Sequence, residues 1–157
     1  MAQLIVLAVS FVVLMTAGRL GVRPLQNWVT SLRWAFSLMF LLTASAHFGS
    51  RRPDLVQMVP AVFPNPELLV TLTGIAEIAG AIGLVIPRFA PLAAGALALL
   101  LVALFPANVH AARAGLEIGG EPVTPLVPRT LMQIGFIAAL LAAGFAPRWS
   151  ARVQRLA

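Results

Sequence analysis

The chain contains an almost unbroken apolar run over residues 68–86, LLVTLTGIAEIAGAIGLVI, with a single carboxylate, Glu77, near its middle. A run of this length predicts a transmembrane helix. An ionisable side chain at mid-membrane depth costs at least ~2.5 kcal/mol, so we expect Glu77 to face protein or water rather than lipid. Small residues around it, including Gly74, Gly80 and Gly83, favour close approach of neighbouring helices. The sequence therefore predicts a helix bundle that shelters one acid.

The composition indicates that the rest of the chain is also a membrane protein. Of its 157 residues, 60% are hydrophobic and 10% are charged, whereas soluble proteins carry about 25% charged residues. The net charge of +6 comes from 11 arginines scattered between apolar runs. This scatter indicates topology signals and contacts with lipid phosphate, and it argues against nucleic acid as a partner. The absence of cysteine and tyrosine excludes disulfides, thiol chemistry and a tyrosyl radical within the chain.

The apolar runs predict one transmembrane domain over 1–157, an all-α protein with a four-helix transmembrane bundle, one extra N-terminal span and no separate soluble domain. The extra span covers about 3–18; its arginines follow the run, which favours a retained helix over a cleaved signal peptide. The bundle covers about 28–146, and a tail follows at 147–157. The first span of the bundle is expected to run from 28 or 31 to 48, in a helix that starts near Pro24. The other three are expected at 66–86, at 91–112 with a kink at Pro106, and at 128–146, ended by Pro147.

The connecting segments predict the orientation. We expect amphipathic helical turns within 54–64, a helix cap at Asn65, a tight turn at 87–91 and a polar loop at 114–127. Acidic residues are confined to one side of the membrane, apart from Glu77. The positive-inside rule therefore predicts a multi-pass protein with its N-terminus outside and its C-terminus in the cytoplasm. The residues of the expected cytoplasmic side are Arg19, Arg23, Arg33, Arg88, Arg148, Arg152 and Arg155, with Trp28, Trp34 and Trp149 at its interface.

Polar side chains from several spans fall toward the outer end of the bundle. Arg129 and Gln133 are four residues apart and share a helix face, and Gln133 can also act as a hydrogen-bonded link between helices. Asn108 either faces the same volume or caps carbonyls freed by Pro106. His110 is two residues from Asn108, so we expect it to point away. The candidate site residues are His47, Glu77, Asn108, His110, Arg129 and Gln133.

Three interpretations of Glu77 remain open at this point. It forms a structural ion pair with Arg129, it binds a ligand or exchanges a proton, or it is an unpaired protonated acid. His47 lies so near the helix end that it can face water or lipid headgroups instead. A metal site of Glu77, His47 and His110 has suitable donors, but no spacing supports it, so no metal is predicted.

Several segments resemble the DoxX family of small bacterial membrane proteins. They are SAHF (45–48), MVP (58–60), PNPELL (64–69), LTGIAEIAGAIGLVIP (72–87), FPANVHAA (105–112) and the Arg-xxx-Gln opening of the last helix. The resemblance covers about 31–146 and implies a four-helix bundle, to which the helix before Arg19 is an addition. It also implies that the protein lies in the bacterial cytoplasmic (inner) membrane. Many relatives have a proline where this chain has Leu131. The functional residues carried over are His47, Glu77, Pro106, Asn108, His110, Arg129 and Gln133.

The resemblance also implies a function. The DoxX family takes its name from a subunit of a thiosulfate:quinone oxidoreductase, other members are associated with quinones and oxidative stress, and distant animal relatives are receptor-assembly chaperones. We therefore expect a pocket around Glu77 that opens outward and binds a quinone or similar amphiphile, the chain holding no cofactor of its own. Glu77 would exchange protons, and a membrane or soluble redox partner would supply electrons; whether the protein is an enzyme stays open, as does a homo-oligomer. The alternative is an accessory or assembly factor with a structural Glu77–Arg129 pair.

Overall fold

Helices make up nearly all of the structure, a computed structural model that describes residues 2–154, with side chains described for 2–146. Five helices are long and apolar enough to span a membrane, so the predicted all-α fold is confirmed and this is a multi-pass membrane protein. The tail residues Arg148, Trp149, Arg152 and Arg155 lie outside the described side chains. The elements are α1 (Ala2–Arg19), η1 (Arg23–Gln26), α2 (Trp28–Phe48), α3 (Arg52–Met58), α4 (Pro66–Val85), α5 (Ala90–Ala103), α6 (Phe105–Ala114), β1 (Glu117–Ile118), β2 (Glu121–Pro122) and α7 (Leu126–Gln154).

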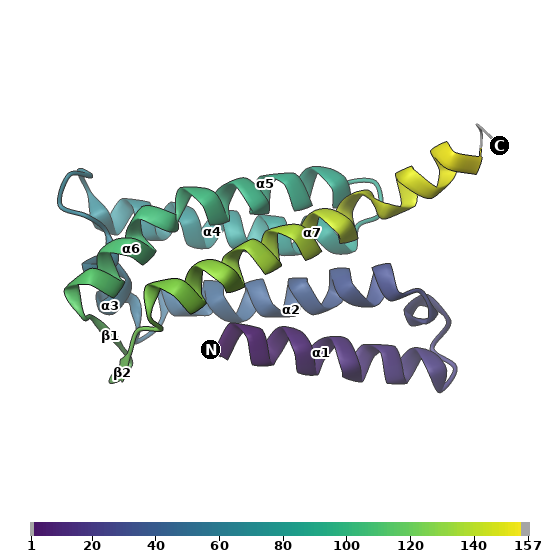
Figure 1. Cartoon of the computed structure of the whole chain (residues 1–157), viewed down its shortest axis with the longest axis horizontal. Coiled ribbons are helices and arrows are strands. Elements are labelled where there is room, and N and C mark those ends of the chain that lie inside the picture. Colours follow the sequence, from purple (N-terminus) through teal and green to yellow (C-terminus); the bar gives the residue numbers. More distant parts are fainter. Residues whose placement is uncertain (1, 155–157) are drawn as a thin grey trace.

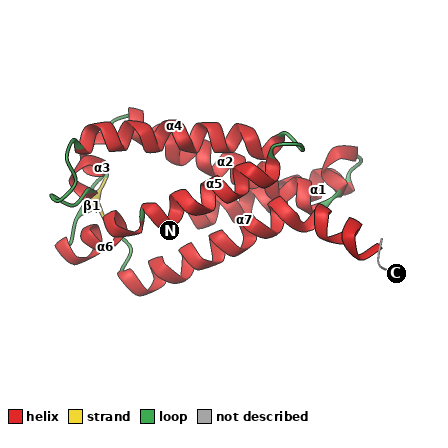
Figure 2. Ribbon diagram, turned by 90° about the horizontal axis from the view of Figure 1, so that it is seen from above, coloured by secondary structure: helices red, strands yellow, loops and turns green. Residues whose placement is uncertain are grey.

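The long helices lie side by side as an elongated bundle (Figure 1). Helix α4 packs between α2 and α5, α7 packs on α5 and α2, and α1 lies along the outside of α2. Helices α3 and α6 and the β1–β2 hairpin gather at one end, which we call the hairpin end (Figure 2). The opposite end, the turn end, holds the connections at 20–27 and 86–89. The predicted four-helix bundle with an added N-terminal span is thus observed.

The apolar core fills the half of the bundle nearer the turn end. Phe36 stacks on Phe40 and meets Phe136 edge-on, with ring centroids 6.3 and 6.5 Å apart. Glycines bring the helices together here, because a Cβ at Gly83 would lie 2.8 Å from the Ala93 Cβ. The largest fully buried side chains are Phe36, Phe40, Leu84, Leu97 and Leu140, together with Ser31. This packing leaves the hairpin-end half as the place where polar groups collect.

The start of α2 differs from the prediction. We expected a helix from Pro24, but Pro24 lies in the short 3-10 helix η1, and α2 begins at Trp28. Asn27 sets this boundary, since its Oδ1 accepts a hydrogen bond of 2.9 Å from the backbone N–H of Val29. Such a cap satisfies one of the N–H groups that have no partner within the helix. The capping asparagine therefore outweighs the preference of proline for a first turn.

The two helix-breaking prolines behave differently. The predicted interruption at Pro106 is confirmed, because α5 ends and α6 begins around Leu104. The expected end at Pro147 is wrong, since α7 continues to Gln154. Proline lacks the N–H that would bond the carbonyl four residues earlier, here that of Ala143. Arg33 supplies a substitute: its Nε donates to the Ala143 oxygen at 2.9 Å, so continuing the helix leaves that carbonyl paired.

The hairpin end contains more structure than the sequence predicted. Helix α3 provides the helical turns expected within 54–64. The predicted polar loop contains the antiparallel β1–β2 hairpin, whose turn residues Gly119 and Gly120 have φ of 64° and 79°. The Gly119 N–H donates to the Asp54 carboxylate at 2.8 Å, which ties the hairpin to α3. Asn65 occupies the predicted cap position of α4, but its side chain makes no capping hydrogen bond and its φ is 55°.

Candidate functional site

Glu77 lies buried between α4 and α2, with 5% of its surface exposed. The Oγ1 atom of Thr43 lies 2.8 Å from its Oε2 atom, at hydrogen-bond distance. The Nε2 atom of His47 lies 3.8 Å from the same oxygen, within ion-pair range when the imidazole is protonated but too far for a hydrogen bond. The expectation that the protein shelters Glu77 from lipid is therefore confirmed.

The orientation of His47 is fixed by its other ring nitrogen. Nδ1 lies 2.7 Å from the carbonyl oxygen of Val70 and 3.3 Å from Oγ1 of Thr73. A carbonyl can only accept, so Nδ1 carries a hydrogen and donates it. Nε2 is then the nitrogen that faces Glu77. The interpretation that His47 faces water or headgroups is wrong, since the residue is 8% exposed.

A close approach of α2 and α4 places these side chains together. A Cβ at Gly74 would lie 2.7 Å from the His47 Cβ and 2.9 Å from Cε2 of Phe48, so glycine is needed at this point. Arg52 spans the same two helices from α3. It donates to the His47 carbonyl at 2.9 Å and to Oγ1 of Thr71 at 2.9 Å. Arg52 therefore links α2 and α4 at the hairpin end of the site, and the sequence analysis did not single out this arginine.

The sequence analysis also missed the two threonines, although a spacing could have indicated them. Thr43 precedes His47 by four residues on α2, and Thr73 precedes Glu77 by four on α4. Residues four apart share a helix face, so each helix offers one threonine beside one ionisable group. In the antiparallel pair, each threonine faces the ionisable residue of the other helix.

The contact between Thr43 and Glu77 is compatible with either protonation state of the acid. Oγ1 of Thr43 also lies 3.0 Å from the carbonyl of Phe40, and a hydroxyl has one hydrogen to donate. When that hydrogen goes to Glu77, the carboxylate is the acceptor. When it goes to Phe40, a protonated Glu77 can donate to Oγ1. The hydroxyl can therefore follow a change of proton on the acid by rotating.

Two polar atoms at this site have unused hydrogen-bonding capacity. Within the described part of the chain, Oε1 of Glu77 and Nε2 of His47 have no hydrogen-bond partner, yet every fully enclosed side-chain polar atom there has one. Both atoms therefore keep a small exposed area, although the residues themselves are buried. Glu77 lines neither of the two described grooves, so a pocket opening outward from it remains a prediction.

A second polar network joins α6 to α7. Arg129 donates through Nη1 to Oδ1 of Asn108 at 2.7 Å and through Nε to the Thr124 carbonyl at 3.2 Å. The Asn108 amide lies 3.4 Å from Oε1 of Gln133, whose Nε2 donates to the carbonyl of Leu101 at 2.8 Å. Gln133, rather than Asn108, therefore satisfies a carbonyl near the Pro106 break.

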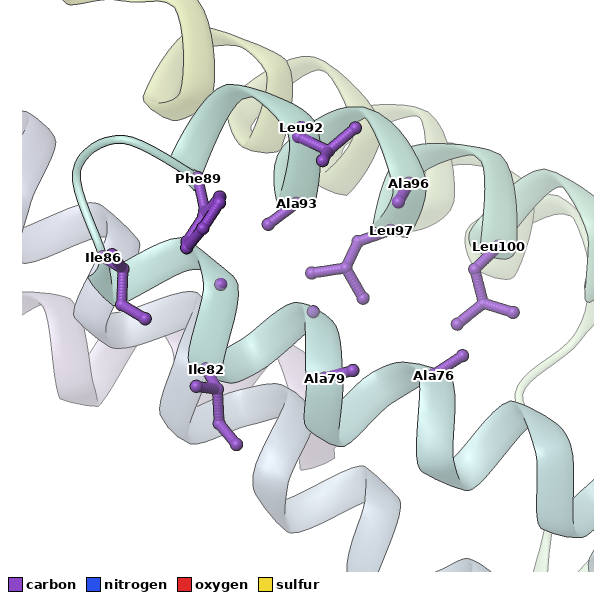
Figure 3. A pocket seen from close by; sticks show the side chains of 12 residues that line it. Ala76, Ala79, Ile82, Ile86, Phe89, Leu92, Ala93, Ala96, Leu97 and Leu100 are labelled. Carbon is purple, nitrogen blue, oxygen red and sulfur yellow. The ribbon is translucent and has the colours of Figure 1, made fainter.

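The two clusters lie in the same half of the bundle. Leu100 of α5 and Ala76 of α4 line the same end of one groove, which places them at similar depth (Figure 3). Leu101 and Glu77 are their immediate neighbours in sequence, and Gln133 bonds Leu101. The prediction that these polar groups share one end of the bundle is thus consistent with the packing.

The predicted ion pair between Glu77 and Arg129 is not formed in the described part of the chain, where the ion-pair contact of Glu77 is with His47. The break at Leu104 explains the separation. It lets α6 lean on α3 and α7 rather than on α4 (Figure 2). Asn108 therefore lies away from α4 and bonds Arg129 of α7, while Glu77 of α4 contacts Thr43 of α2.

His110 lies apart from both clusters. It lines a shallow groove of about 690 Å³ on α6, together with Phe105, Pro106 and Arg113. Asn108 is not part of that lining, so His110 points away from the network, as expected. Among the residues that the structure describes, no three histidine, aspartate or glutamate side chains are grouped as metal ligands would be.

Residues 36–143 match the family described as a domain of unknown function (DUF8561). The match covers more than half of the chain, which therefore belongs to this family. Comparison with curated proteins and with solved structures gives no match. The resemblance to the DoxX family stays a prediction, because the family that matches is DUF8561.

Proposed function

We propose that this DUF8561 protein binds a quinone, or a similar small amphiphile, beside Glu77 and takes part in a membrane redox or stress-response system. The observation that supports the proposal is the buried contact between Nε2 of His47 and Oε2 of Glu77 across two neighbouring spans, beside a Glu77 Oε1 that has no hydrogen-bond partner in the described part of the chain. Ionisable groups at such depth are costly and usually serve a function. The resemblance to the DoxX family favours a quinone as the ligand.

The chemistry of the two side chains suits a quinone head group. A quinone oxygen accepts hydrogen bonds, and a hydroquinone hydroxyl donates them. An imidazolium form of His47, in which Nε2 carries a second hydrogen, or a protonated Glu77 can donate to the first, and a Glu77 carboxylate can accept from the second. Arg129 and Asn108 contribute less in this proposal, because they already bond each other. Glu77 is thus the proton donor and acceptor, positioned by Thr43.

The chain supplies protons rather than electrons in this scheme. Reducing a quinone to a hydroquinone takes two electrons and two protons. With no cysteine or tyrosine in the sequence, the electrons must come from a membrane or soluble redox partner. The protein would then be the quinone-binding component of an oxidoreductase.

The accessory-factor alternative now rests on different contacts. Without an Arg129 pair, Glu77 would serve to join α4 to α2 through Thr43 and His47. Such interhelical hydrogen bonds contribute about 0.6 kcal/mol on average and up to about 1.7 kcal/mol in membranes. This structural role needs no ligand, and that difference can be measured.

The test compares Glu77→Gln with Glu67→Gln, a change of the same charge at an exposed position of the same helix. Purified protein is heated in detergent with and without a short-chain quinone. At a hundred times its dissociation constant, a ligand adds about 2.7 kcal/mol, or about 5–10 °C in Tm for a chain of this size. We expect wild type and Glu67→Gln to show this shift and Glu77→Gln to lose it while remaining folded. If no protein responds to quinone and Glu77→Gln is simply less stable, the proposal fails and the structural role stands.

A further inference from the structure

An apolar groove of about 600 Å³ runs along the seam between α4 and α5 (Figure 3). Its floor is made of small residues, which leave space between the two helices, and its walls are aliphatic and aromatic. Ala76 and Leu100 lie at one end, and Ile86 and Phe89 lie at the other, beside the turn that joins the helices. We propose that this groove holds an acyl chain of an anionic phospholipid whose phosphate pairs with Arg88.

The lining of the groove suits a hydrocarbon chain. All twelve lining residues are apolar or glycine, so no side chain in the groove offers a hydrogen bond to a polar ligand. Both helices are membrane spans, and the groove runs toward the turn end, where a lipid head group would lie. An acyl chain can therefore lie along the seam with its head at the turn.

Arg88 provides the charge that selects an anionic head group. Its guanidinium lies 4.3 Å from the ring centroid of Phe89, which itself lines the end of the groove. In the part of the chain that the structure describes, no acidic side chain pairs with this exposed arginine. It also precedes the N-terminus of α5, where the helix dipole favours a negative charge. A phosphate at this point would interact favourably with both the Arg88 guanidinium and the N-terminal end of α5.

A second copy of the chain fits the groove less well. Subunits related by a twofold axis along the membrane normal would present the same turn at the same depth. Packing two copies across this seam would therefore bring two Arg88 guanidinium groups toward each other, and no acidic side chain of the described residues pairs with either. A lipid phosphate removes that repulsion instead of creating it.

Lipid retention tests the proposal. Protein stripped of lipid is mixed with phosphatidylglycerol or phosphatidylcholine of identical acyl chains, and bound lipid is counted by native mass spectrometry. Arg88→Gln is compared with Arg113→Gln, an exposed arginine at the hairpin end. Ala79→Leu, which fills the groove, is compared with Ala138→Leu, at an exposed position of α7. A photoreactive phosphatidylglycerol, with its label in the acyl chain, locates the site.

We expect wild type to prefer phosphatidylglycerol, with label on α4 and α5. One arginine near an anionic surface is worth about a five-fold preference, so Arg88→Gln should lose about that factor and Arg113→Gln should keep it. Ala79→Leu should lose the label and Ala138→Leu should retain it. Equal retention of both lipids by wild type, or an unchanged preference in Arg88→Gln, overturns the proposal. A dimer that Ala79→Leu alone dissociates would assign the groove to a second copy.

Discussion

Replacing Gly74 by alanine tests the close contact of helices on which the candidate site depends. The new Cβ would lie 2.7 Å from the His47 Cβ, whereas ordinary contact begins at about 3.4 Å. The helices α2 and α4 must therefore separate locally by about 0.7 Å, the difference between these distances. His47 and Thr43 belong to α2 and Glu77 to α4, so the same movement disturbs their contacts.

The change in stability expected for Gly74→Ala follows from two opposing effects. Alanine is favoured over glycine inside a helix by about 1 kcal/mol, and one extra methyl group in a packed contact typically costs about 1–3 kcal/mol. Gly95 of α5 provides the matched control, because a Cβ there meets nothing within 4 Å. We therefore expect Gly74→Ala to be about 1–3 kcal/mol less stable than Gly95→Ala.

Thermal unfolding of the two variants in the same detergent measures this difference. For a chain of this size it corresponds to about 2–12 °C in Tm, and Gly95→Ala should unfold at or above the temperature of wild type. Gly74→Ala should also weaken any quinone-dependent stabilisation, since it displaces His47 from Glu77. If both variants gain stability equally, α2 and α4 do not approach as closely as described, and the account of the site is wrong.

Two further predictions concern the side chains that satisfy freed carbonyls. Arg33 bonds the Ala143 oxygen, which Pro147 leaves without a helical donor. Arg33→Met should therefore lower stability by about 1–2 kcal/mol more in wild type than in a Pro147→Ala background, as a double-mutant cycle of Tm values would show. Equal losses in the two backgrounds would show that Arg33 does not replace the missing donor. Gln133→Leu should lower stability by about 0.6–1.7 kcal/mol, since it removes the donor to Leu101, and an unchanged Tm would show that this carbonyl needs no donor.

Much of the fold is predictable because a membrane imposes strong conditions on a sequence. A span needs about 20 apolar residues whose backbone groups are all paired, so the five runs had to be helices. The same condition placed Glu77 inside the bundle, as the structure shows. Sequence spacing also placed His110 away from Asn108, because two residues on a helix turn the side chain to another face.

The partners of the site could not be predicted in the same way. Spacing gives the face of a helix but not which helix packs against it, so Arg129 was the expected partner of Glu77, whereas the structure places His47 and Thr43 beside it. The choice was decided by Gly74, which brings α2 against α4, and by the break at Leu104, which takes α6 away from α4. Both effects depend on tertiary packing, which no pattern within one span contains.

Carbonyls left unpaired at the two prolines explain why Arg33 and Gln133 are present, but they do not explain Glu77. Arg33 bonds a carbonyl four residues before Pro147, and Gln133 bonds one close to Pro106. A membrane offers no water to satisfy such carbonyls, so these side chains have a backbone role that explains their presence. The Glu77 carboxylate cannot donate to a carbonyl unless it is protonated, and its described contacts are with side chains. Backbone repair therefore does not account for Glu77, which leaves the proposed proton exchange with a ligand and the interhelical contacts with Thr43 and His47 as its two candidate roles.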